Sequence, residues 1–164
     1  MGTLTDQIKS TYGEKLRVRV CGICITDKGL LLVHHKSIGK NGSLWAPPGG
    51  GMEYGEDAKT ALIREFKEET NLDIEVTKFL FVHEYLDPPL HGIELFFEVK
   101  ILGGNLNRGI DPEMEDDLQI ITQVEFKSLS EIQQLPKRDL HFVIQNATNF
   151  KNLLNQRGYF KFNS

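Results

Sequence analysis

The order of apolar and polar positions along the chain predicts strands and helices that follow one another without internal repeats. Apolar or alternating runs predict strands over residues 16–25, 30–35, 74–85, 93–102 and 120–126. A short helix is predicted over 129–134, and apolar residues at helical spacing predict an amphipathic helix over 139–155. The polar segment 1–15 is expected to form a short helix or a flexible arm. Together these elements predict a mixed sheet between helices in one domain, residues 1–164.

A further helix is predicted to begin near Glu56 and to end at Asn71. Asp57 is a good N-cap residue, its charge suits the positive end of the helix dipole, and strong helix formers follow it. Asn71 tolerates the left-handed C-cap conformation almost as well as glycine does.

The segment before this helix, Trp45–Gly55, contains two prolines followed by three glycines. It is therefore predicted to be an irregular loop. Such a loop can bring its backbone close to a ligand, and the N-terminus of the following helix suits a phosphate. A plain turn between a strand and a helix is the commoner role of such glycines, and no Gly-Lys-Ser/Thr follows to make the segment a P-loop.

The carboxylates of the predicted helix are expected to lie on its buried side. At about 100° per residue, Glu65 and Glu69 fall within the arc of the apolar residues, and Glu68 falls at its edge. Buried carboxylates are costly unless a cation or hydrogen-bond donors satisfy them, and the i, i+3, i+4 spacing points all three at one patch. Oxygen ligands of this kind suit magnesium or manganese. The alternative is that these glutamates and Arg64 form ordinary ion pairs on the helix surface.

The residues around this helix resemble the Nudix box of the Nudix hydrolase superfamily. The box is a glycine, five residues, a glutamate, seven residues, then Arg-Glu-apolar-x-Glu-Glu-x-Gly-apolar. It is met by Gly50, Glu56, Arg64, Glu65, Phe66, Glu68, Glu69 and Leu72. Asn71 stands where the family usually has glycine, and it can adopt the same C-cap conformation. The resemblance implies an α/β fold of the Nudix type, which is an α/β/α sandwich with a mixed central sheet.

The resemblance also implies metal-dependent hydrolysis of a pyrophosphate bond in a nucleoside diphosphate linked to another moiety. Arg64 would orient the glutamates, and Glu56 would support the loop and the helix. Magnesium, or manganese as a substitute, would be bound by the backbone carbonyl of Gly49 and by the carboxylates of Glu65, Glu68 and Glu69.

A later acidic segment, residues 111–117, offers a further carboxylate for the same site. In several Nudix families a glutamate from a loop in this region is a metal ligand or the general base, and Glu115 is the candidate here. The other interpretation of the segment is a solvated acidic loop. Whether the base is Glu115 or a glutamate of the box is left open by the sequence.

The substrate is also left open, among nucleotide sugars, ADP-ribose and nucleoside triphosphates. The products would be a nucleoside monophosphate and either a phosphorylated remainder or pyrophosphate. The alternative from another class is a catalytically silent Nudix-like domain that binds a nucleotide as a sensor. Such domains usually have damaged box carboxylates, whereas those of this chain are intact. Homodimers are common in the family, so a homodimer is expected by analogy.

Two further sets of side chains are candidates for contacts with a nucleotide substrate. Positive charge for a phosphate is offered by Arg17, Arg19, His34, His35 and Lys36. A ring that stacks on a base is offered by Phe79, Phe81, Tyr85, Phe96 and Phe97. For each of them taken alone, a solvent-facing or a core position is the commoner role.

Composition limits the partners and the location. The formal net charge of −4 argues against a nucleic acid polymer as partner. No apolar run approaches the ~18 residues of a membrane span, and the first residues lack the layout of a signal peptide, so no membrane partner is expected. Cys21 and Cys24 lie in an apolar run without a second cysteine pair or a nearby histidine, which favours buried free thiols over a zinc site. Free thiols fit a cytoplasmic protein.

Overall fold

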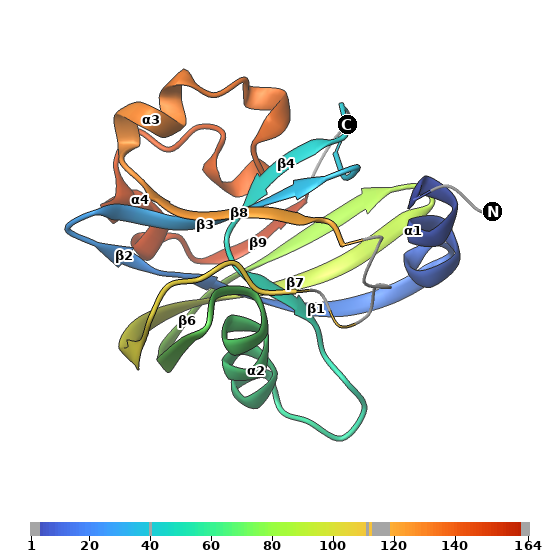
Figure 1. Ribbon diagram of the computed structural model, residues 1–164, viewed down its shortest axis with the longest axis horizontal. Helices are drawn as coiled ribbons and strands as arrows, with labels where there is room; N and C mark the ends of the chain where they lie inside the picture. Colours follow the sequence, from blue (N-terminus) through green and yellow to red (C-terminus); the bar gives the residue numbers. More distant parts are fainter. Residues whose placement is uncertain (1–3, 40, 111, 113–118, 162–164) are drawn as a thin grey trace.

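The computed structural model describes residues 4–39, 41–110, 112 and 119–161 (Figure 1). The helices are α1 (Leu4–Tyr12), α2 (Ala58–Thr70), α3 (Leu129–Gln134) and α4 (Phe150–Asn155). The strands are β1 (Lys15–Ile23), β2 (Ile25–Thr26), β3 (Gly29–Lys36), β4 (Ser43–Ala46), β5 (Gly49–Gly51), β6 (Leu72–Asp87), β7 (Leu90–Gly104), β8 (Ile121–Lys127) and β9 (Gly158–Lys161). Among the helices in these ranges, none combines the length and the apolar character needed to cross a membrane.

The strands form two sheets, and the larger one is mixed. Its order is β5-β1-β7-β6-β9, with β1 parallel to β7, β6 parallel to β9, and the other pairs antiparallel. The smaller sheet has four strands: β2 pairs with the start of β3, β4 pairs with its end, and β8 also pairs antiparallel with β3. The predicted α/β class with a mixed central sheet and helices is confirmed. The division into two sheets is an addition that the apolar pattern did not predict.

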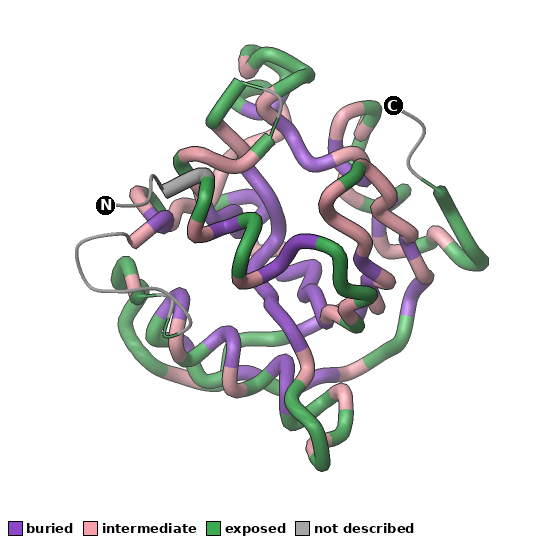
Figure 2. Tube along the Cα trace, turned by 90° about the vertical axis from the view of Figure 1, so that its right-hand side faces the viewer, coloured by how far each residue is buried: buried purple, intermediate pink, exposed green. Residues whose placement is uncertain are grey.

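Two apolar cores lie on the two faces of the larger sheet, and Figure 2 shows buried positions running through the centre of the molecule. One core packs α2 against the sheet through Leu62 and Phe66, both fully buried. The other joins the sheet to β3 and to the C-terminal turns. Cys21 on β1 and Cys24, which directly follows β1, are buried free thiols in different cores.

Helix α2 begins and ends where its sequence predicts. Asp57 is the N-cap, and its side chain accepts hydrogen bonds from the backbone N–H groups of Lys59 and Thr60. Asn71 is the C-cap in the left-handed conformation, with φ 60°. The replacement of the usual glycine by asparagine therefore leaves the helix end intact, and the box carboxylates keep their spacing on one helix face.

The prediction of a long amphipathic helix over residues 139–155 is wrong. Two 3-10 turns, Lys137–Asp139 and Phe142–Ile144, precede α4. The prediction failed because apolar residues three apart fit a chain of short turns as well as an α-helix. Two polar side chains start new turns inside the segment: His141 accepts from the N–H of Val143, and Asn149 accepts from the N–H of Asn152. The apolar residues Leu140, Val143, Ile144 and Leu153 are nevertheless buried.

The segment Gly49–Gly51, which was predicted to be irregular, is the edge strand β5. It pairs antiparallel with β1, in the register Cys21 with Gly49 and Arg19 with Gly51. A Cβ atom on Gly49 would lie 2.0 Å from the carbonyl oxygen of Val20. Glycine is therefore needed for the two backbones to approach this closely. The run of glycines, which predicted an irregular loop, is what allows β5 to pair with β1.

Candidate active site

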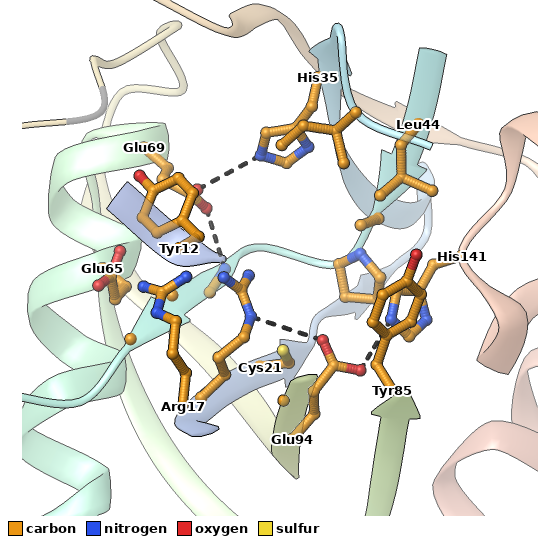
Figure 3. A pocket seen from close by; sticks show the side chains of 18 of the residues that line it. Tyr12, Arg17, Cys21, His35, Leu44, Glu65, Glu69, Tyr85, Glu94 and His141 are labelled. Atoms are coloured by element: carbon orange, nitrogen blue, oxygen red, sulfur yellow. Dashed lines mark hydrogen bonds and ion pairs between the residues drawn. The ribbon is translucent and has the colours of Figure 1, made fainter. Parts of the chain in front are cut away.

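A pocket lies where α2, the glycine strand β5 and the middle of the larger sheet meet (Figure 3). Helix α1 and strands β3 and β6 also contribute to its wall. The polar and aromatic residues that line it include Tyr12, Arg17, Arg19, His35, Arg64, Glu65, Glu68, Glu69, Tyr85, His91, Glu94 and His141. The three box glutamates predicted as metal ligands therefore lie on one wall of a single pocket, together with Gly49.

The box glutamates are held against the glycine strand. The backbone N–H of Gly49 donates a hydrogen bond of 2.9 Å to Oε2 of Glu69, and the other oxygen of Glu69 lies 3.7 Å from Nε2 of His35. Glu65 and Glu69 are buried, at 9% and 6% exposure. The surface ion-pair alternative is therefore wrong for these two side chains, and the predicted buried arc is observed.

The positive charge near these carboxylates does not offset the cost of burying them. Burial raises the pKa of Glu65 to about 7, and the charge of Glu69 adds to the shift, although Arg64 and Arg19 oppose it. Burial also raises the pKa of Glu68. Carboxylate oxygens that share a pocket and are short of countercharge are the ligand set that a hard divalent cation prefers. The residues present therefore fit the predicted magnesium or manganese ion.

Arg64 links the glutamates to one another and to the loop. Its Nη1 donates to Glu65 Oε1 at 2.9 Å and to Glu68 Oε2 at 3.2 Å. Its Nη2 donates to Glu56 Oε1 at 2.6 Å and to the carbonyl oxygen of Gly51 at 3.1 Å. These hydrogen bonds raise the pKa of Arg64 and, for Glu56, lower the carboxyl pKa. Arg64 thus connects Glu56 and the glycine strand to two glutamates of α2, and its orienting role stays a prediction.

Gly50→Ala is expected to weaken Mg²⁺ binding at least ~10-fold and to lower the free energy of unfolding by about 1–3 kcal/mol. The added methyl group would stand 2.3 Å from Cδ of Glu65, so the carboxylate would have to move. Gly103→Ala is the matched control, because the atom nearest to its new Cβ is 3.8 Å away. Calorimetric titration with Mg²⁺ and urea unfolding measure both effects. Equal Mg²⁺ affinity in Gly50→Ala and the wild type would contradict the assignment of Glu65 as a ligand.

The sheet side of the pocket carries groups of a different kind. Arg17 and Arg19 project from β1, and the Arg17 guanidinium lies 4.2 Å from the centre of the Tyr12 ring. Beyond them, Tyr85 and His141 lie beside Glu94 (Figure 3). Glu94 and His141 were not predicted from the sequence. Glu94 shares the face of β7 that carries Phe96, but Phe97 on the opposite face is also buried, so alternation did not single out Glu94, and no local signal indicated His141.

The other predicted candidates divide between the pocket and the rest of the fold. His35, Tyr85 and Phe96 line the pocket. The rings of Phe79 and Phe97 pack edge to face away from the lining, and Phe81 stacks on Phe96 in the core. His34 lies by Ser43, Thr122 and Trp45, and Lys36 is exposed at the end of β3. Phe96 is fully buried, so a base-stacking role can come only from Tyr85 among the five rings considered.

Glu115 lies outside the described residues. Pro112, which is described and belongs to the same acidic segment, lines the pocket. The role assigned to Glu115 stays a prediction.

Comparisons with known proteins agree with this geometry. The NUDIX domain family model matches residues 15–144. An ADP-ribose pyrophosphatase of Methanocaldococcus jannaschii is 38% identical over 96 residues, 57% of this chain and 56% of that relative, so the match spans little more than half of the relative's length.

Solved structures show the same fold at low identity. The MutT protein of Methanosarcina mazei Go1 has a TM-score of 0.65 at 16% identity, covering 85% of this chain and 94% of that one. The MutT NUDIX hydrolase of Burkholderia pseudomallei has a TM-score of 0.64 at 22% identity, covering 87% and 98%. At these identities the likeness extends to the fold alone.

Proposed function

Because the chain belongs to the NUDIX domain family, we propose that it is a metal-dependent hydrolase of the pyrophosphate bond in a nucleoside diphosphate derivative. The observation that carries this proposal is the convergence of Glu65, Glu68 and Glu69 on one pocket, with Arg64 bridging the first two. The intact carboxylates argue against the silent sensor domain. The family match and the ADP-ribose pyrophosphatase relative both support a pyrophosphohydrolase.

The residues that would hold the metal are the three box glutamates and the backbone carbonyl of Gly49. The hydrogen bond from Gly49 to Glu69 supports this grouping, because it keeps the glycine strand beside the carboxylates. A divalent ion bound there supplies charge neutralisation for the phosphoryl oxygens and acidifies the attacking water. We propose Mg²⁺ as the ion, with Mn²⁺ as a substitute.

The protein's own groups have separate tasks in this proposal. Arg64 keeps the glutamates oriented through its hydrogen bonds. Arg17 and Arg19, which project from β1 beside the glycine strand, bind the oxygens of the diphosphate and hold it in place. The general base is a box glutamate or Glu115. Arginine is suited to the binding task because its planar donors match phosphate geometry.

ADP-ribose is the first substrate to test, because the relative of 38% identity is an ADP-ribose pyrophosphatase. Nucleotide sugars and nucleoside triphosphates complete the panel. The assay measures phosphate released by a coupled phosphatase with Mg²⁺, with Mn²⁺ and with EDTA. We expect turnover of at least one compound that EDTA abolishes. Binding of a nucleotide without turnover of any compound would favour the sensor alternative.

Three further parts of the proposal concern the whole molecule. We propose that residues 1–164 form one domain, since α1 contributes to the pocket and β9 extends the sheet. We propose a cytoplasmic location, which the two free thiols support. The proposed homodimer is tested by light scattering, where the mass of a single chain, 18.7 kDa, would reject it.

A further inference from the structure

A second group of titratable side chains lies on the pocket wall, apart from the box. The register of the larger sheet places Arg19, Glu94 and His83 in one row across β1, β7 and β6. Nδ1 of His83 lies 2.8 Å from Glu94 Oε2, and Nε2 of His141 lies 2.9 Å from the same oxygen. Arg19 Nε lies 3.5 Å from Oε1. Glu94 is 5% exposed, and it lines the pocket with Arg19 and His141.

The spacing of His83, Glu94 and His141 would suit a metal ion, since their nearest ligand atoms lie within 4.8 Å of one another. The hydrogen bonds of His141 argue against one. Its Nδ1 accepts from the backbone N–H of Val143 at 3.3 Å, so the proton of the neutral ring is on Nε2 and points at Glu94. A neutral imidazole that bound a metal through Nε2 would carry its proton on Nδ1, facing the Val143 donor. The cluster is therefore a hydrogen-bonded network.

The network fixes an ionised carboxylate in the pocket wall. Burial alone would raise the pKa of Glu94, but His141, His83 and Arg19 outweigh it and hold the pKa well below its usual range. Both histidine donors are directed at Oε2. Oε1 has the longer contact with Arg19, and a carboxylate oxygen accepts more than one hydrogen bond. Glu94 thus presents a fixed acceptor to whatever enters this side of the pocket.

The position of Glu94 relates this acceptor to the proposed chemistry. Gly51, Arg19 and Glu94 are consecutive neighbours across β5, β1 and β7. Because β7 lies two strands away from β5, the backbone of Glu94 is roughly 10 Å from the glycine strand that contacts the box carboxylates. The arginine lies between them. If the diphosphate binds beside Arg19, the part of the substrate attached to the diphosphate lies beside Glu94. A further phosphate at that position would be repelled by the negative charge of Glu94.

We propose that Glu94 selects the substrate by accepting a hydrogen bond from an uncharged donor group next to the diphosphate. This inference rests on the proposed function, which supplies the diphosphate. The donor is a hydroxyl or an amine, and it belongs either to the sugar-like moiety or to the base. His83 and His141 are positioning residues, since each acts through Glu94.

The test pairs the best substrate of the panel with two analogues. One analogue lacks the amino group of the base, and the other lacks the hydroxyls of the moiety beyond the diphosphate. Wild-type kcat/KM is expected to fall on the order of 10²-fold or more for one analogue, because Glu94 is then left without its donor. In Glu94→Gln, kcat/KM for the parent substrate and for that analogue is expected to differ less than ~10-fold. Which analogue is affected identifies the source of the donor.

Two variants accompany Glu94→Gln. Glu94→Asp keeps the charge and shortens the side chain, so it is expected to lose part of the discrimination even if Glu94→Gln does not fold. Glu98→Gln is the matched control, because Glu98 lies on the same strand and is not part of the pocket lining. It is expected to discriminate as the wild type does. Equal discrimination by the wild type and both Glu94 variants would overturn the inference.

Calorimetric binding of the same compounds in EDTA separates this inference from the proposed function. If the wild type binds the parent compound at least ~10-fold tighter than one analogue, and Glu94→Gln does not, the inference stands whether or not hydrolysis occurs. Absence of turnover with such binding would reject only the proposed hydrolysis. If neither turnover nor binding distinguishes the analogues, the selective role of Glu94 is rejected.

Discussion

Glu69→Gln is expected to lower kcat for pyrophosphate hydrolysis on the order of 10²–10³-fold at saturating Mg²⁺. The amide keeps an oxygen that can accept the hydrogen bond from Gly49, so the glycine strand stays in place. What is lost is one negative charge among the proposed metal ligands. Coupled phosphate release measures the rate, and calorimetric titration measures the accompanying loss of Mg²⁺ affinity.

The control for Glu69→Gln is Glu75→Gln, which removes the same charge from an exposed position on β6. It is expected to leave kcat within about 2-fold of the wild type, because surface substitutions away from such features have small effects. The far-ultraviolet circular dichroism of both variants should match the wild type. Magnesium-dependent turnover of Glu69→Gln at the wild-type rate would reject the assignment of α2 as the metal-binding helix.

Arg64→Lys is expected to weaken Mg²⁺ binding and to lower kcat/KM, each by about 10–100-fold. Lysine keeps the positive charge, but its three N–H donors lie on one nitrogen, so it cannot reproduce the bridge that the two guanidinium nitrogens make to Glu56, Glu65 and Glu68. The glutamates would then repel one another without a fixed orientation. Unfolding by urea should show a loss of stability of about 1–3 kcal/mol, because partly buried acceptors lose their donors.

The reverse exchange on the same helix, Lys67→Arg, is the control. Lys67 forms an exposed ion pair of 2.9 Å with Asp73, and exposed pairs contribute little to stability. It is expected to match the wild type in Mg²⁺ affinity and stability. If Arg64→Lys behaved like Lys67→Arg, charge alone would suffice at position 64, and the orienting role of the guanidinium would be rejected.

The parts of the fold that the sequence predicts are those specified by nearby residues. Helix α2 has its caps, its buried arc and its carboxylates within one short segment, so its limits and its functional face were predictable. The spacing of the box also identified Arg64 and Glu56 as site residues, and the structure shows the hydrogen bonds between them. Long apolar runs gave β6 and β7 for the same reason.

The rest depends on contacts between distant segments. Glu94, His83 and His141 meet only because β6, β7 and a C-terminal turn are brought together. Phe96 and Phe97 are both buried, on opposite faces of β7, so alternation could not say which face Glu94 occupies. The strand β5 was missed because its pairing depends on the absence of side chains, whereas strand propensity is a property of side chains.

Helix α1 has a consequence for how this protein can diverge from its relatives. The family model matches from residue 15 onward, yet Ile8 and Tyr12 of α1 line the pocket. Exchange of the first fourteen residues for those of a relative would therefore remodel one wall of the pocket while every residue of the box stays unchanged. Chimaeras of this kind are expected to alter substrate preference while the proposed metal ligands stay unchanged.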